Sequence, residues 1–228
     1  MSARPSSGAP EPRLPPGVSR YGWFAGVVVV LLIAYVTLNT ARSDGPGSSG
    51  VNAGEWMPPF AAPLAIGPVQ GDVNVARRSG QGAAGGRPAC DVRGPGVLNV
   101  CALWERGPVV LAFLATRGAK CTGELDALER VRRGHPGVQF AAVSIRGDRN
   151  ALRALVRRHG WGFPVAYDRD GILANLYGVA VCPQVTYALP GGRVSDTTVG
   201  ELDRAGLEER VAALERAARA AGWRPPGR

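Results

Sequence analysis

The chain has 228 residues, 45% of them apolar, which suffices for one domain of ordinary size together with additional segments. Its formal charge of +9 comes from arginine, since Lys120 is the only lysine, and the arginines are scattered along the chain. No basic stripe interleaved with aromatic residues is visible in the sequence, so the charge does not indicate a nucleic-acid-binding protein.

The first 55 residues are expected to form a tail, a membrane anchor and a linker. Residues 1–20 and 41–55 are rich in Pro, Gly and Ser and contain too few apolar groups to offset the entropy of ordering, so we expect a disordered tail and a flexible linker. Between them, residues 21–40 contain no charged side chain and approach the length of about 20 residues that spans a bilayer. This pattern predicts a transmembrane helix.

The arginines around this segment predict its orientation. Arg4, Arg13 and Arg20 precede it and only Arg42 closely follows it, so the positive-inside tendency leaves the N-terminus in the cytoplasm. A cleaved signal peptide is the alternative, but its apolar region normally has about 7–15 residues and its small-x-small cleavage site fits residues 39–41 poorly. We therefore expect a single-pass protein of the cell membrane with an extracytoplasmic domain.

Residues 56–222 are expected to form that domain, followed by a short tail at residues 223–228. The continuous apolar run at residues 109–114 is typical of a central strand covered on both faces. Apolar residues then recur at helical spacing up to Gly134, and residues 138–145 predict a second strand. This alternation indicates a sheet with helices packed on it.

The same alternation continues toward the C-terminus. Asp148 suits the N-cap of a helix that ends near Gly160, and a short strand is predicted at residues 163–167. A hairpin through Pro190-Gly191-Gly192 joins predicted strands at residues 184–189 and 193–199. The last predicted helix carries apolar residues on one face: Leu207, Val211, Leu214 and Ala218.

Three segments carry a resemblance to a known family. They are the strand from Pro108 to Ala115 with the turn and helix start at residues 116–125, the segment 177–186 around Pro183, and Trp56-Met57-Pro58-Pro59-Phe60. Together they resemble the thioredoxin-like redoxins, in particular the membrane-anchored thiol-disulfide oxidoreductases and AhpC/TSA-like proteins. The resemblance implies a thioredoxin-like α/β fold with a central mixed sheet flanked by helices, and a cis peptide bond before Pro183.

The expected active-site motif is degenerate. The family normally uses Cys-x-x-Cys, in which the first sulfur attacks a substrate disulfide and the second resolves the mixed disulfide. Here the motif reads Gly118-Ala119-Lys120-Cys121, so only the second cysteine is present. A thioredoxin cycle within this motif is therefore impossible.

Four cysteines in an exported domain favour disulfides, and the residues alone leave three pairings open. The resemblance implies that Cys182, before the cis-proline, lies beside Cys121 at the active-site turn. Cys90 and Cys101 fall in a segment that resembles an insertion, where we expect a local structural disulfide.

The resemblance also assigns roles around these sulfurs. Cys121 and Cys182 are the candidate catalytic residues, and Pro183, Gly118, Arg117 and Lys120 are expected to position the substrate. A helix N-terminus together with Arg117 and Lys120 should stabilise a thiolate at Cys121. Glu124, one helical turn later, could also influence Cys121.

Three functions are compatible with these residues. The first is thiol–disulfide exchange through Cys121 and Cys182, with protein thiols or disulfides or a small thiol as partner. The second is peroxide reduction by Cys121, although Gly118 replaces the threonine of the peroxiredoxin motif. The third is a binding module in which the Cys121–Cys182 bridge is only structural.

The sequence predicts no cofactor and no metal site. The Gly-rich run at residues 79–86 lacks the Gly-Lys-Ser/Thr that completes a phosphate-binding loop, so it is expected to form a flexible surface loop. No Cys-x-x-Cys or His-x-x-x-His is present, and His135 and His159 follow arginine pairs near predicted helix ends. We therefore expect both histidines to be structural.

Overall fold

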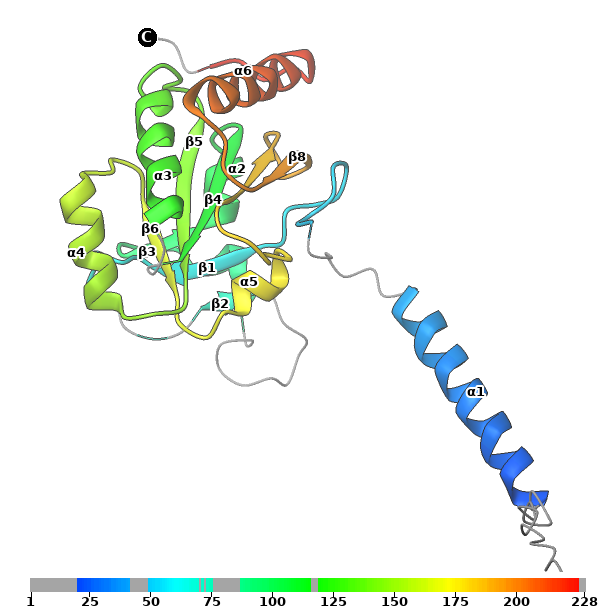
Figure 1. Cartoon of the computed structure of the whole chain (residues 1–228). Coiled ribbons are helices and arrows are strands. Elements are labelled where there is room, and N and C mark those ends of the chain that lie inside the picture. The colour runs from blue at the N-terminus through cyan, green and yellow to red at the C-terminus, as the bar shows by residue number, and fades with distance from the viewer. Residues whose placement is uncertain are drawn as a thin grey trace, which may run out of the picture. The chain divides into compact units, whose positions relative to one another are not determined.

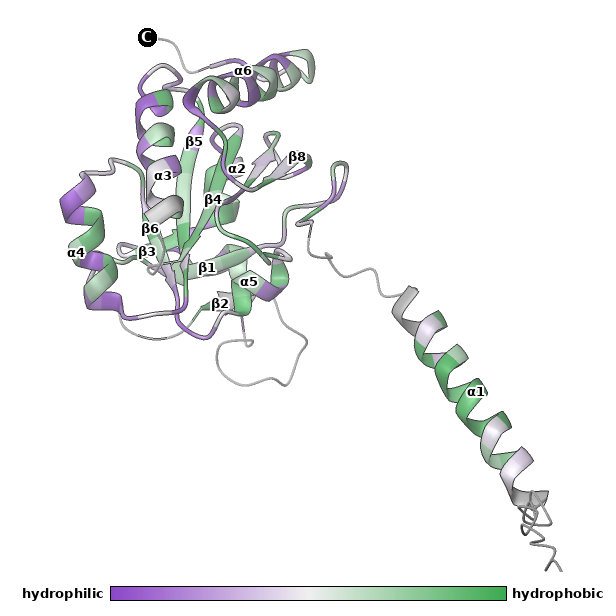
Figure 2. Cartoon of the chain, in the orientation of Figure 1, coloured by the Kyte–Doolittle hydropathy of each residue, from purple (hydrophilic) through white to green (hydrophobic). Residues whose placement is uncertain are grey.

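The computed structural model describes residues 20–41, 49–69, 71, 73–75, 87–115 and 119–225, in two units, Met1–Asp44 and Gly45–Arg228 (Figure 1). The first unit contains one helix, α1 (Arg20–Ala41), whose described side chains from Trp23 to Leu38 are largely apolar and exposed (Figure 2). Within the described part of the chain, no helix combines the length and the apolarity needed to cross a membrane. Residues 1–19 of the predicted N-terminal tail lie outside the described residues.

The second unit is built on a five-stranded mixed sheet with the order β6-β5-β4-β7-β8. The parallel strands β4 (Val109–Ala115), β5 (Gln139–Ile145) and β6 (Val165–Asp168) lie side by side, and β7 (Gln184–Ala188) runs antiparallel to β4. The edge strand β8 (Val194–Val199) completes the predicted hairpin with β7. The central mixed sheet that the resemblance implied is therefore present.

Both faces of the sheet are covered, which explains the unbroken apolar run of β4. Val110, Ala112 and Leu114 belong to a core cluster with side chains of α3 (Ala119–Arg132), α4 (Arg149–His159) and α6 (Arg204–Ala220). The alternate residues of β4 belong to a second cluster with α2 (Val100–Trp104) and α5 (Ile172–Leu176). Successive side chains of a strand point to opposite faces, so every position of a doubly covered strand is apolar.

The expected caps of α4 are present. The Asp148 side chain accepts a hydrogen bond from the Ala151 N–H at 2.8 Å, and Gly160 ends the helix in the left-handed conformation. The short helix α5 was not predicted from the sequence. It has only five residues and depends on the buried Asp168, whose carboxylate accepts hydrogen bonds from the backbone N–H groups of residues 172–174.

A second, three-stranded antiparallel sheet was also not predicted. Its order is β2-β1-β3, formed by β1 (Phe60–Pro63), β2 (Asn74–Val75) and β3 (Val97–Asn99), with the 3-10 turn η2 (Ala89–Asp91) before β3. Strands of two to four residues are too short to show a period-2 pattern. The four residues of β1 are buried throughout, so they show no alternation either.

Contacts of the domain extend beyond residues 56–222. Val51 is buried, and its carbonyl oxygen accepts a hydrogen bond from the Thr197 hydroxyl at 2.7 Å. At the other end the Trp223 ring lies against Gly137, where an added Cβ would be 2.8 Å from the ring. Part of the predicted linker and of the predicted tail thus packs on the domain.

Candidate active site

The two cysteines proposed as catalytic are joined in the structure. Cys121 is the third residue of α3, and Cys182 lies in the loop before β7. Their Cα atoms are 5.7 Å apart and their sulfurs form a disulfide. This separation lies within the usual range for bridged cysteines.

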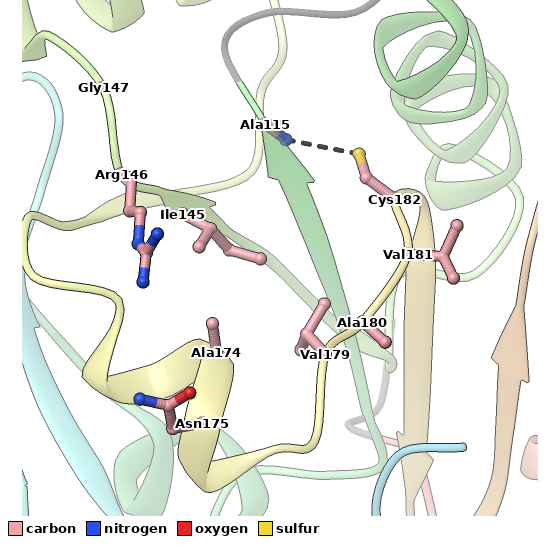
Figure 3. A pocket seen from close by; sticks show the side chains of 10 residues that line it. All are labelled: Ala115, Ile145, Arg146, Gly147, Ala174, Asn175, Val179, Ala180, Val181 and Cys182. Atoms are coloured by element: carbon pink, nitrogen blue, oxygen red, sulfur yellow. Dashed lines mark hydrogen bonds between the residues drawn. The ribbon is translucent and has the colours of Figure 1, made fainter. Parts of the chain in front are cut away.

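The sheet topology explains how residues 61 positions apart come together. β4 and β7 are antiparallel neighbours, with Phe113 paired to Gln184, so the start of β7 meets the end of β4. The chain leaves the end of β4 to enter α3, which carries Cys121. At the same point the Ala115 N–H donates a hydrogen bond to the Cys182 Sγ at 3.2 Å (Figure 3).

The peptide bond between Cys182 and Pro183 is cis, as the resemblance implied. Pro183 is buried, and its carbonyl oxygen accepts a hydrogen bond from the Gly200 N–H at 2.9 Å. Of the other predicted positioning residues, Arg117 and Gly118 lie outside the described residues. Lys120 is described only as part of the α3 backbone.

The second cysteine pair lies elsewhere in the domain. Cys90 and Cys101 form a disulfide with Cα atoms 5.4 Å apart, between η2 and α2. The buried Asn99 braces the same loop, because its side-chain amide donates to the carbonyl oxygens of Ala89 and Val92, both at 2.9 Å. This arrangement suits a local structural bridge.

Glu124 lies one helical turn after Cys121 and is buried. Burial raises the pKa of its carboxyl group from 4.5 to about 7, against a smaller opposing effect of the Leu202 N–H, which donates to Oε2 at 3.3 Å. Its Oε1 has no hydrogen-bond partner among the described residues. A carboxyl group that titrates near neutral pH can hold or release a proton one helical turn from Cys121.

A pocket of about 590 Å³ opens at the ends of β4 and β5, beside Cys182 (Figure 3). Among its described lining residues, Arg146 and Asn175 contribute polar side chains, in addition to the Cys182 sulfur. The remaining lining residues are small or apolar: Ala115, Ile145, Gly147, Ala174, Val179, Ala180 and Val181. Neither Arg146 nor Asn175 was a predicted site residue, although Arg146 directly follows a parallel strand, a position that often contributes to ligand sites.

The histidines lie in other surroundings. His159 Nδ1 is 2.9 Å from Asp126 Oδ1, and His135 Nε2 is 2.8 Å from Glu208 Oε1. Each contact joins two helices or a helix and a loop, so both histidines serve the packing of the domain. In the described part of the chain, no group of three or more His, Cys, Asp or Glu side chains is placed to hold a metal ion.

The mixed sheet, the covering helices and the cis-proline beside the Cys121–Cys182 disulfide define a thioredoxin-like fold. In agreement with this class, residues 98–197 match the AhpC/TSA family.

Among curated proteins, the chain is similar to the thiol-disulfide oxidoreductase ResA of Oceanobacillus iheyensis, with 26% identity over 102 residues. The match covers 44% of this chain and spans about half of that relative, 53% of its length.

Two solved structures from Chlorobium tepidum support the fold. One, described as a thiol:disulfide interchange protein DsbE, has a TM-score of 0.56 and 20% identity, covering 72% of this chain and 98% of the other. The second, a thiol:disulfide interchange protein of the thioredoxin family, has a TM-score of 0.52 and 13% identity, covering 72% and 97%.

Proposed function

We propose that the domain is an oxidoreductase that performs thiol–disulfide exchange with Cys121 and Cys182 as its redox couple. The observation that carries this proposal is the difference in access between the two bonded sulfurs. Cys182 lines the open pocket, whereas Cys121 is only 5% exposed. A bridge with one sheltered and one accessible sulfur suits exchange, in which an incoming thiolate attacks one sulfur and the other leaves.

In the oxidising direction, a substrate thiolate attacks Cys182 Sγ and forms a mixed disulfide, while Cys121 leaves as a thiolate. A second substrate thiolate then attacks the substrate sulfur of the mixed disulfide, which yields a substrate disulfide and a Cys182 thiolate. Two electrons pass from the substrate to the couple. In the reducing direction the Cys182 thiolate attacks a substrate disulfide, and Cys121 attacks the Cys182 sulfur and releases the substrate as a dithiol.

The surroundings of both sulfurs suit their charged forms. The Ala115 N–H, 3.2 Å from Cys182 Sγ, can stabilise a thiolate there by a charge-assisted hydrogen bond. Cys121 lies in the first turn of α3, where the helix dipole favours negative charge. Glu124, with its pKa near 7, can exchange the proton that Cys121 gains or loses.

The relatives named above as thiol-disulfide oxidoreductase and thiol:disulfide interchange proteins support the same activity for this chain. Peroxide reduction by Cys121 is less well supported, because this sulfur is buried and its access to a hydroperoxide is restricted. A purely structural bridge is less well supported because Cys182 opens onto a pocket.

A redox titration tests the proposal. The full-length Cys90→Ala/Cys101→Ala protein, in detergent, is equilibrated in glutathione buffers of known potential, and the free thiols are counted after acid quenching. We expect one two-electron transition, which disappears when Cys121→Ser or Cys182→Ser is added. A bridge that stays oxidised in excess dithiothreitol, or reduced protein that consumes hydroperoxide through a sulfenic acid at Cys121, would contradict it.

We also propose that residues 21–40 anchor the domain at the outer face of the cell membrane. The support is the uncharged sequence of this segment and the exposed apolar side chains of α1 between Trp23 and Leu38. Full-length protein should stay in the membrane pellet after a carbonate wash, and a chain that begins at Gly45 should be soluble. Recovery of the full-length protein in the soluble fraction would remove this part of the proposal.

A further inference from the structure

Arg146 has an unusual backbone conformation at the rim of the pocket. It directly follows β5 and has a φ of 57°, a left-handed value that non-glycine residues seldom adopt. Its N–H donates to the Asp168 carbonyl oxygen at 2.8 Å, which ties this turn to the end of β6. The backbone that carries the guanidinium is therefore fixed on two neighbouring strands.

The neighbouring loop leaves room for the Arg146 side chain. Gly171 lies beneath it, and an added Cβ at Gly171 would be 2.8 Å from Arg146 Nε. In Figure 3 the guanidinium lies on one side of the pocket and Cys182 on the other, with Ala115 at the end of β4 between them. A ligand in the pocket can thus reach both the sulfur and the cation.

The charge of Arg146 is not compensated locally. Among the described residues, no hydrogen-bond or ion-pair partner contacts its guanidinium, and it is the only charged residue that lines the pocket. The nearby Asp168 carboxylate is buried and already accepts hydrogen bonds from the backbone at the start of α5. An exposed cation over lining residues that, where the structure describes them, are neutral and mostly apolar favours a ligand with one negative charge and an apolar part.

We propose that this pocket binds the segment of a protein substrate next to its reactive cysteine, with Arg146 pairing with an acidic side chain of that segment. The inference rests on the proposed function, because the bound segment is the one whose sulfur exchanges with Cys182. Ile145, Val179 and Val181 offer contact to an apolar side chain between the cysteine and the acidic residue. This combination favours a polypeptide over a small carboxylated disulfide such as oxidised glutathione, which has no apolar side chain to place there.

Kinetics with matched peptides test the charge preference. Reduced full-length protein in detergent is mixed with peptides that contain one internal disulfide, an adjacent Leu, and then Glu, Gln or Lys. We expect the Glu peptide to react about five- to tenfold faster than the Lys peptide at low salt, mainly through KM. Arg146→Gln should abolish this preference, Arg146→Glu should reverse it, and Arg146→Lys should retain part of it.

Arg157→Glu is the matched control for Arg146→Glu, because both substitutions change the net charge by the same amount. Arg157 is exposed on α4 and is not among the described residues that line the pocket. An equal preference in wild type and Arg146→Gln, or an equal loss in Arg157→Glu, would overturn the assignment. An Arg146-dependent reaction with oxidised glutathione as fast as that with the Glu peptide would overturn the choice of a protein segment.

A binding measurement separates this inference from the proposed function. Peptides with Ser in place of both cysteines cannot exchange, so their affinity for the oxidised protein depends only on the pocket. The Glu peptide should bind more tightly than the Lys peptide, and only Arg146 variants should remove the difference. Failure of the glutathione titration would refute the redox couple, whereas equal binding of the two Ser peptides would refute the acidic-segment site.

Discussion

Cys121 and Cys182 share one disulfide but differ in their access to solvent. Cys121 is 5% exposed and belongs to the core cluster between the sheet and α3, whereas Cys182 is only partly buried and lines the pocket at the end of β4. In a protein with the usual Cys-x-x-Cys motif, the sulfur that meets the substrate would stand at position 118, which is Gly118 here. We therefore propose that Cys182, the cysteine before the cis-proline, is the one that reacts with the substrate.

This difference predicts unequal single-cysteine variants. With Cys121→Ser, the remaining Cys182 thiol should react with iodoacetamide and should trap mixed disulfides with substrates. With Cys182→Ser, the remaining Cys121 should react at least about tenfold more slowly, because burial limits the access of the reagent to its sulfur. The rates are measured by mass spectrometry in native buffer, with urea-unfolded protein as the control in which both thiols should react alike. A faster reaction at Cys121 would reverse the proposed roles.

Much of the domain with the thioredoxin-like fold could be predicted from the sequence because its elements have strong local signals. The apolar run of β4 and the capped helix between Asp148 and Gly160 are visible without tertiary information. The short strands β1 and β3 and the helix α5 could not be predicted, since they exist only through long-range pairing or through the Asp168 carboxylate.

Some residues of the candidate site could likewise be predicted from the sequence, and others could not. The approach of Cys182 to Cys121 followed from the family resemblance, since their positions in the sequence do not determine their distance. Arg146 was not predicted as a site residue, because its position after a strand is only a weak signal and most exposed arginines have no such role. Its significance depends on the left-handed turn and on the neighbouring α5, which places Ala174 and Asn175 on the pocket.

The two glycines of the β7–β8 hairpin should differ in their tolerance of alanine. Both have left-handed φ values, 87° for Gly191 and 92° for Gly192. A Cβ at Gly191 would meet nothing within 4 Å, whereas one at Gly192 would lie 2.7 Å from the Trp104 ring. We expect Gly191→Ala to lower the free energy of unfolding by about 1 kcal/mol and Gly192→Ala by about 3 kcal/mol.

Urea unfolding followed by tryptophan fluorescence measures both changes. The Gly192→Ala/Trp104→Leu double variant supplies the control, because a smaller and more flexible side chain at position 104 should reduce the extra cost of the Cβ. Equal losses in the two single variants would show that the Trp104 contact does not constrain the turn.

Removal of the Cys90–Cys101 bridge should affect stability and leave exchange unchanged. The bridge closes a short loop, with a sequence separation of 11, and Cys101 is buried. Cys90→Ala/Cys101→Ala should lower the free energy of unfolding by about 3 kcal/mol, through the gain in entropy of the unfolded chain. The midpoint potential of the remaining couple, measured in glutathione buffers, should match that of the wild type. A shift in this potential would mean that the two cysteine pairs are coupled.

Glu124 should make the stability of the domain depend on pH near neutrality. Burial raises its pKa to about 7, so the folded state holds this proton more tightly than the unfolded state does. The corresponding stability is fully present below the unfolded pKa of 4.5 and is lost as the pH rises through about 7. A shift of this size corresponds to at most about 3 kcal/mol.

Glu124→Gln should therefore raise the free energy of unfolding at pH 8.5 by about 1–3 kcal/mol and change it little at pH 4. The control is Glu129→Gln on the same helix. The Arg132 guanidinium, hydrogen-bonded at 2.8 Å, lowers the pKa of Glu129, so its carboxylate stabilises the domain above the unfolded pKa and this variant should lose stability at neutral pH. Urea unfolding from pH 4 to pH 9 distinguishes the two signs. A pH profile for Glu124→Gln parallel to that of the wild type would mean that the pKa of Glu124 is the same in the folded and unfolded states, so that this group does not supply a proton to Cys121 near neutral pH.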